Sequence, residues 1–291
     1  MKKLEGISTA LVTPFKEGMI DFEGFERLLA YQIEGGINAV LVSGTTGEAP
    51  SLTREERVLL IRRAKEYCRG RVFVIAGVGT NSTKTSVEYA KDAAESGADA
   101  LLAVVPYYNK PNEEGLYRHF EAIAKTVELP LILYNVPSRT GMEMPIEAIA
   151  RLAKLKNVVA LKEASTNLER ISEVRSKSEI TILSGNDSLA LPSFALGAEG
   201  VISVVSNVAP KEMRAMWEHY MNGDTEGALK THQKLFRLMR ALFVETNPIP
   251  VKAALSIMGL CSDEVRLPLA PASAATRELL KRELAALGLL C

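Results

Sequence analysis

Short apolar runs alternate with longer amphipathic segments along this chain, and this alternation limits the folds open to it. Eight runs rich in Val, Ile and Leu begin at Ile7, Asn38, Val72, Ala100, Leu131, Val158, Ile180 and Gly200. Apolar residues fill consecutive positions in each run, which is typical of a parallel strand buried on both faces. Eight strand–helix units in succession predict an α/β fold, the (β/α)8 TIM barrel.

A doubly wound open sheet is the alternative, because βα alternation alone does not distinguish an open sheet from a closed one. The count of eight units favours the barrel. The first run is also not followed by the G-x-G-x-x-G turn of a dinucleotide-binding fold.

The segments between the runs carry helix-end signals. Thr53 and Glu56 form a capping-box pattern before a helix that we expect to stop at Gly70. Pro145 suits the first turn of another helix, and Gly97 suits a C-terminal cap.

The pattern changes after the eighth unit, near residue 223. Three helical segments follow without a strand between them: TEGALKTHQKLFRLMRALFV, PIPVKAALSIMGL and SAATRELLKRELAALGLL. We therefore predict a catalytic barrel over residues 1–223 and a small C-terminal three-helix domain over residues 224–291.

Charge and composition exclude several classes of protein. Thirty-five basic residues balance 35 acidic ones and no basic patch stands out, so nucleic acid and anionic membranes are poor partners. No apolar stretch reaches the roughly 18 residues that span a bilayer, and the start does not resemble a signal peptide. The three cysteines (Cys68, Cys261 and Cys291) are too scattered for a disulfide framework, which predicts reduced thiols and a cytoplasmic location.

The run VVALKEAS, residues 158–165, places a lysine inside an otherwise apolar strand. A buried ammonium is costly, so such a lysine tends to lose its proton and become a nucleophile. In a TIM barrel the active site lies at the C-terminal ends of the strands, and Lys162 is near the end of the sixth run. The alternative is an exposed lysine just past the strand, partnered by Glu163.

The turn GTTGE, residues 44–48, follows the second run. Its two glycines permit a tight turn that presents backbone N–H groups and hydroxyls to a small anion. It lacks the Gly-Lys-Ser/Thr ending of a P-loop, so a carboxylate suits it better than a polyphosphate. An ordinary turn is the alternative.

Two further motifs follow the fourth and fifth runs, PYYNKP and LYNVPSRTG. Tyr107 and Tyr108 are neighbours in an extended segment and point in opposite directions, so one can serve the site and the other a subunit contact. Tyr134 lies one strand from Lys162, where a hydroxyl can carry protons. Arg139 can bind a substrate carboxylate, unless it is a surface ion pair.

No metal site is indicated. His119, His219 and His232 all lie in predicted helices, away from the strand ends, and no clustered carboxylates suggest a metal. We expect no metal and no cofactor, which leaves Lys162 to form the electrophile.

Taken together, these motifs resemble the dihydrodipicolinate synthase family, within a superfamily of pyruvate-dependent Schiff-base lyases that includes N-acetylneuraminate lyase. The superfamily features are G-x-T-G-E, the tyrosine of YNVP and the lysine of LKE. The double threonine, YYNKP and SRTG are specific to the subgroup. The resemblance covers essentially the whole chain.

The resemblance implies that Lys162 forms an imine with pyruvate, and that the derived enamine attacks L-aspartate 4-semialdehyde to give 4-hydroxy-tetrahydrodipicolinate. This is the first committed step of diaminopimelate and lysine biosynthesis. Implied roles are proton transfer through Tyr134, Thr45 and Tyr108, pyruvate carboxylate binding at Thr46, second-substrate carboxylate binding at Arg139, and backbone lining at Gly185 and Ile202. Tyr108 is expected to cross into a neighbouring subunit's site, which implies a homo-oligomer, usually a dimer of dimers.

Two alternatives stay open: a sister lyase or aldolase acting on a 2-keto-3-deoxy sugar acid, and a non-catalytic binding barrel. Family members inhibited by lysine bind it with a serine, two histidines and a glutamate, among others. The matching positions here are Ala49, Arg54, Arg57 and Thr85, while Asn81 and Tyr107 are retained. Two arginines would repel a cationic effector, so we predict weak or no inhibition by lysine.

Overall fold

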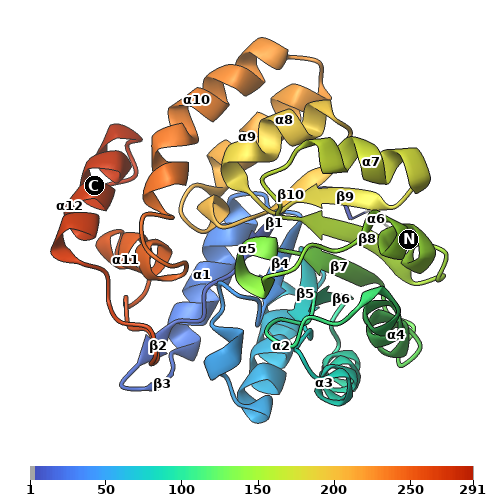
Figure 1. Ribbon diagram of the computed structural model, residues 1–291. Helices are drawn as coiled ribbons and strands as arrows, with labels where there is room; N and C mark the ends of the chain where they lie inside the picture. The colour runs from blue at the N-terminus through green and yellow to red at the C-terminus, as the bar shows by residue number, and fades with distance from the viewer. Residues whose placement is uncertain (1–3, 291) are drawn as a thin grey trace.

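Eight parallel strands form a closed barrel in the computed structural model, which describes residues 4–290 (Figure 1). They are β1 (Gly6–Ala10), β4 (Ala39–Val42), β5 (Phe73–Gly77), β6 (Ala100–Val104), β7 (Leu131–Asn135), β8 (Val158–Glu163), β9 (Thr181–Ser184) and β10 (Gly200–Ser203). Each predicted run corresponds to one of these strands, and β1 pairs with both β4 and β10. The TIM barrel is therefore confirmed, and the open doubly wound sheet is excluded. A short hairpin of β2 (Phe15–Lys16) and β3 (Met19–Ile20) was not predicted.

Helices surround the barrel, with two helix-end signals where we expected them. The barrel helices are α1 (Phe22–Glu34), α2 (Arg54–Cys68), α3 (Thr83–Glu95), α4 (Glu113–Ala124), α5 (Pro137–Thr140), α6 (Ile146–Leu152), α7 (Glu169–Lys177), α8 (Ala190–Ala195) and α9 (Pro210–Met221). Short 3-10 turns are η1 (Ala49–Ser51), η2 (Asp187–Leu189) and η3 (Val205–Asn207). The capping box of Thr53 and Glu56 is formed, and Gly97 follows α3 with a φ of 84°. Pro145 is the N-cap of α6 rather than a residue of its first turn.

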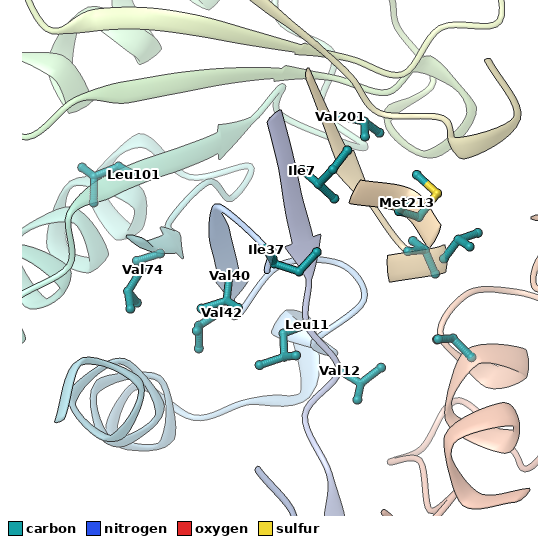
Figure 2. Packing of buried hydrophobic residues seen from close by; sticks show 14 of the residues in the cluster. Ile7, Leu11, Val12, Ile37, Val40, Val42, Val74, Leu101, Val201 and Met213 are labelled. Atoms are coloured by element: carbon teal, nitrogen blue, oxygen red, sulfur yellow. The ribbon is translucent and has the colours of Figure 1, made fainter. Parts of the chain in front are cut away.

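Both faces of each strand are buried, which explains the unbroken apolar runs. Along β4, Ala39 and Leu41 belong to the cluster inside the barrel, while Val40 and Val42 belong to the larger cluster under the helices. Figure 2 shows Val40 and Val42 on the same side of the strand, as the two-residue period requires. Two covered faces leave no position at which a polar residue would be favoured.

The C-terminal part consists of α10 (Thr225–Ala241), α11 (Ile249–Ile257) and α12 (Ala274–Ala286), coloured orange to red in Figure 1. The three predicted helical segments are confirmed. Helix α10 packs against α9, and α12 packs against both α10 and α11. The domain boundary near residue 224 stays a prediction, and Cys291 lies outside the described residues.

Candidate active site

Lys162 and Tyr134 lie side by side at the C-terminal ends of β8 and β7. The strand register pairs the two residues directly. Ala160 belongs to the cluster inside the barrel, so Lys162, two residues further on, also points inward. Its side chain is buried, at 5% exposure, and its Nζ lies 4.2 Å from the centroid of the Tyr134 ring.

Glu163 is not the partner of this lysine. It lies on the opposite face of β8, where its carboxylate accepts a hydrogen bond from Arg170 Nε at 3.1 Å. Within residues 4–290, no carboxylate forms an ion pair with Lys162. The alternative of an exposed lysine paired with Glu163 is therefore wrong.

Burial lowers the pKa of Lys162 to about 8. The positive charge of Arg139 lowers this pKa further, whereas the negative charge of Asp187 raises it and limits the shift. A pKa of about 8 leaves roughly a tenth of the amines neutral at pH 7, against fewer than about one in a thousand for an ordinary lysine. The cavity thus supplies a usable fraction of nucleophile near neutral pH.

The phenol of Tyr134 keeps its proton. Burial raises its pKa to about 12, although Arg139 and a hydrogen bond from the Thr45 hydroxyl both act in the opposite direction. A protonated phenol beside an amine can donate a proton to a reacting oxygen and take it back through Thr45.

A cavity of about 190 Å³ opens in front of the lysine. It is lined by Ala10, Leu41, Thr45, Thr46, Tyr134, Val136, Ser138, Arg139, Lys162, Ala164, Gly185, Asn186, Val204, Phe243 and Asn247. Gly185 is required here, because a Cβ at that position would lie 2.5 Å from the Ala164 Cβ and 3.1 Å from the Lys162 Cε. Ile202 is fully buried inside the barrel behind this cavity rather than on its wall.

Arg139 lies in the short helix α5 and lines this cavity together with an adjoining one of about 220 Å³. Its Nη2 donates to the Asn247 carbonyl at 3.0 Å. Within the described part of the chain it forms no ion pair with a carboxylate, so the surface-ion-pair alternative is wrong. Its guanidinium remains available to an anionic ligand.

The two adjacent tyrosines do point different ways. Tyr107 lines the adjoining cavity, next to Tyr134. Tyr108 is 90% exposed and has a φ of 71°. Among the residues expected to be catalytic, Tyr108 does not line the Lys162 cavity of the same chain.

Sequence reasoning missed several residues of the site. Asn247, which precedes α11, donates from Nδ2 to the Thr46 hydroxyl at 3.0 Å, and its buried Oδ1 has no partner. Asn186 and Phe243 also line the cavity. The only local signal was an asparagine before two prolines in NPIP, which by itself is typical of a turn.

The histidines lie on helices, as predicted. His119 on α4 is buried against Thr83, and burial lowers its pKa to about 4, so it is neutral.

Among residues 4–290, no group of three or more His, Cys, Asp or Glu side chains could hold a metal ion. No helix in the same range is long and apolar enough to cross a membrane.

This geometry defines a class of protein: a (β/α)8 barrel with a buried, unpaired lysine aimed into a small cavity, suited to forming an imine with a carbonyl compound. The chain belongs to the dihydrodipicolinate synthetase family, whose model matches residues 3–287. The family resemblance of the motifs is thereby confirmed.

Individual relatives agree over nearly the full length. The chain is 48% identical to the 4-hydroxy-tetrahydrodipicolinate synthase of Thermotoga sp. (strain RQ2), over 98% of this chain and 99% of the relative. It is similar to the dihydrodipicolinate synthase of Cyanidioschyzon merolae with lysine bound, with a TM-score of 0.97 and 43% identity, covering 99% and 100% of the two chains. A monomeric dihydrodipicolinate synthase variant gives a TM-score of 0.97 at 48% identity, covering 98% of this chain and 97% of that one.

Proposed function

We propose that this chain is a lyase that condenses pyruvate with L-aspartate 4-semialdehyde to give 4-hydroxy-tetrahydrodipicolinate, the first committed step of diaminopimelate and lysine biosynthesis. The observation that carries the proposal is the unpaired amine of Lys162, with its pKa of about 8, in a cavity next to Tyr134. The names of the relatives supply the particular substrates.

The first half of the reaction makes a nucleophile from pyruvate. The neutral Lys162 amine attacks the ketone carbon, and the oxygen leaves as water after taking protons from the Tyr134 phenol and the amine. The product is a protonated imine. Its positive charge accepts electrons when the Tyr134 phenolate left by the first step takes a methyl proton, which restores the phenol and gives an enamine.

The second half joins the two substrates and frees the enzyme. The enamine carbon attacks the aldehyde carbon of L-aspartate 4-semialdehyde, and the aldehyde oxygen becomes a hydroxyl. The amino group of this substrate then attacks the imine carbon and displaces Lys162, which closes the ring. One water is released per product formed.

The carboxylates have candidate partners on the two sides of the lysine. Thr46, in the turn after β4, has a buried hydroxyl on the cavity wall and suits the carboxylate of pyruvate. Arg139 forms no ion pair within residues 4–290 and suits the carboxylate of the second substrate. Gly185 and Ile202 are proposed to contribute backbone groups to the site, and the lack of room for a Cβ beside Lys162 supports this role for Gly185.

Borohydride reduction in the presence of pyruvate, followed by peptide mass mapping, tests the imine. We expect a stable pyruvate-sized adduct on Lys162. Lys252 is an internal control, because it is also buried but is paired with Glu48. An adduct on neither lysine, or on both, would contradict the proposed chemistry.

An aldehyde screen tests the second substrate. With pyruvate fixed, we expect turnover with L-aspartate 4-semialdehyde and much less with sugar aldehydes, which lack the carboxylate that Arg139 would bind. Faster turnover with sugar aldehydes would favour the keto-deoxy sugar acid lyase instead.

We propose further that Tyr108 completes the site of a neighbouring subunit in a homo-oligomer, a dimer of dimers. Its 90% exposure in an isolated chain supports this. The test mixes two weak variants, Tyr108→Ala and Lys162→Met, under subunit exchange. A hybrid dimer would contain one site with both residues, so activity should rise well above that of either variant alone. No rise in mixed dimers would contradict the assignment.

A cytoplasmic location is also proposed. Cys68 and Cys261 are both free, as expected in a reducing compartment. Cell fractionation with an antibody to the chain would test it.

A further inference from the structure

A closed ring of buried polar groups lies on the outer face of β7 and β8, directly behind the proposed catalytic residues. Its members Asn135 and Glu163 each follow a residue of the site by one position, and the strand register pairs them just as it pairs Tyr134 with Lys162. Successive strand residues point to opposite faces, so the ring and the site share the same two backbone segments.

Glu163 is the centre of the ring. Its Oε1 accepts hydrogen bonds from Asn135 Nδ2 at 2.7 Å and from the Ser165 backbone N–H at 2.8 Å. Its Oε2 accepts from Arg170 Nε at 3.1 Å, which joins β8 to helix α7. Burial raises the pKa of Glu163, and the Arg170 charge opposes that rise.

Met144 closes the ring through its backbone. Its carbonyl accepts from Arg170 Nη2 at 2.8 Å, and its N–H donates to Asn135 Oδ1 at 2.9 Å. The hydrogen bonds therefore connect Asn135 to Glu163, Glu163 to Arg170, Arg170 to Met144, and Met144 back to Asn135. Asn135 is 0% exposed, and the two charged members are 5% exposed or less.

Stability alone does not account for this ring. A buried ion pair is commonly no more stabilising than apolar residues of the same volume, because desolvation offsets the attraction. What it adds is directional: the hydrogen bonds fix the ends of β7 and β8 relative to each other and to α7. The residues held in this way are the neighbours of the nucleophile and the proton carrier.

We propose that Asn135, Glu163 and Arg170 are positioning residues, which hold Lys162 and Tyr134 at the separation that imine formation requires. None of the ring residues is among those that line the cavity of Lys162. Its role rests on the proposed function, since it acts through Lys162 and Tyr134. Misplacement of reacting groups by about 1 Å costs on the order of 100-fold in rate, so a small shift of either strand end would be measurable.

Glu163→Gln is the primary test variant. It keeps the shape of the side chain but removes the buried negative charge that faces Arg170, leaving only the more exposed Glu143 carboxylate at 3.4 Å from Arg170 Nε. We expect kcat and the rate of borohydride-trappable adduct formation to fall by roughly 10- to 100-fold, with the KM for pyruvate changed by less than about threefold.

Asn157→Ala is the matched control. Asn157 precedes the opposite, N-terminal end of β8, where its side chain donates to the carbonyls of Ala124, Val127 and Leu129. Its loss should lower the melting temperature while leaving kcat per folded molecule unchanged.

A double variant separates positioning from folding. Glu163→Gln with Arg170→Met leaves no unpaired buried charge, so we expect its melting temperature to recover while kcat stays low. Recovery of kcat together with stability, wild-type kcat in Glu163→Gln, or an equal loss of kcat in Asn157→Ala would overturn the proposal. Absence of any adduct on Lys162 in the unmodified protein would instead reject the proposed function.

Discussion

Two lysines are almost equally buried in this molecule, yet their surroundings give them different chemistry. Lys162 at the end of β8 is 5% exposed and Lys252 in α11 is 0% exposed. Both ammonium groups lie against an aromatic ring, at 4.2 Å from the centroid of Tyr134 and 4.3 Å from that of Phe15. The difference is a carboxylate: Lys252 Nζ lies 2.7 Å from Glu48 Oε1.

The comparison shows that burial alone does not make a lysine a nucleophile. Burial lowers the pKa of both residues, but at Lys252 the charge and the hydrogen bond of Glu48 oppose the shift. Glu48 also accepts from the Arg266 backbone N–H at 3.0 Å, so the pair joins the GTTGE turn to the C-terminal part. One lysine serves structure, and the other is available for chemistry.

Replacing Lys162 should have the largest effect on activity. Lys162→Met removes the lysine amine that lines the cavity, and we expect kcat to fall by roughly 10⁴-fold or more, since the covalent step is lost. Steady-state assays with pyruvate and L-aspartate 4-semialdehyde measure it. Lys156→Met, at an exposed lysine, is the control and should keep full activity. Activity of the Lys162 variant within tenfold of the unmodified protein would reject the imine.

Replacing Lys252 should have the largest effect on stability. Lys252→Met leaves the Glu48 carboxylate buried without its cation, which should cost about 3–5 kcal/mol in the free energy of unfolding. Urea unfolding measures this cost. The double variant Lys252→Met with Glu48→Gln should recover most of the loss, because no buried charge remains. A loss below about 1 kcal/mol would mean that the pair is not a buried ion pair in solution.

Replacing a carboxylate near Lys162 should increase the pKa difference between the two lysines. Asp187 is buried, and its charge raises the pKa of Lys162. Asp187→Asn should therefore lower that pKa below about 8, and the acid limb of the kcat/KM profile for pyruvate should move to lower pH. Glu278→Gln, on the exposed face of α12, should leave the profile in place. A shift of the acid limb to higher pH in Asp187→Asn would contradict the conclusion that the Asp187 charge raises the pKa of Lys162.

Stability should also depend on pH through Lys162. Its folded pKa of about 8 is below the ordinary 10.5, so between these pH values the unfolded chain binds more protons at this residue. The free energy of unfolding therefore gains a contribution that rises with pH across that window. Lys162→Met has no buried ammonium and lacks this contribution. Its free energy of unfolding should therefore exceed that of the unmodified protein at pH 7, and this difference should shrink by pH 10 in urea unfolding experiments. A constant difference would show that the lysine pKa is not depressed.

The smallest expected effect is inhibition by lysine. Arg57 is another buried cation, 8% exposed, with no carboxylate ion pair among residues 4–290. It donates to the carbonyls of Gly77 and Ala49, while the nearby Arg54 pairs with Asp92. A cationic effector would be repelled there, so we predict weak or no inhibition in a lysine titration. Half-maximal inhibition below the millimolar range would refute this, and Arg57→Gln would then show whether the arginine contributes to binding.

Much of the fold was accessible to sequence reasoning because the constraint repeats. Each buried strand needs apolar residues on both faces, so β1 and β4 to β10 could be recognised individually and counted. Lys162 stood out for the same reason, as a charged residue directly after the apolar residues 158–161 of its strand. The hairpin of β2 and β3 was missed because two-residue strands are too short to show a period.

The partners of the polar groups could not be predicted, since they come from distant parts of the chain. Glu48 and Lys252 are 204 positions apart in the sequence, and Thr46 and Asn247, which are hydrogen-bonded, are 201 positions apart. Glu163 is the neighbour of Lys162 in sequence, but the alternation of strand side chains turns it toward Arg170.

The barrel and the lysine at the end of its sixth strand are predictable from the order of residues, because local periodicity and the cost of buried charge act on neighbouring residues. The carboxylate partner of Lys252, and the lack of one for Lys162 among residues 4–290, follow from the three-dimensional arrangement. The reason is that electrostatic energy depends on distances in space, which the order of residues does not specify.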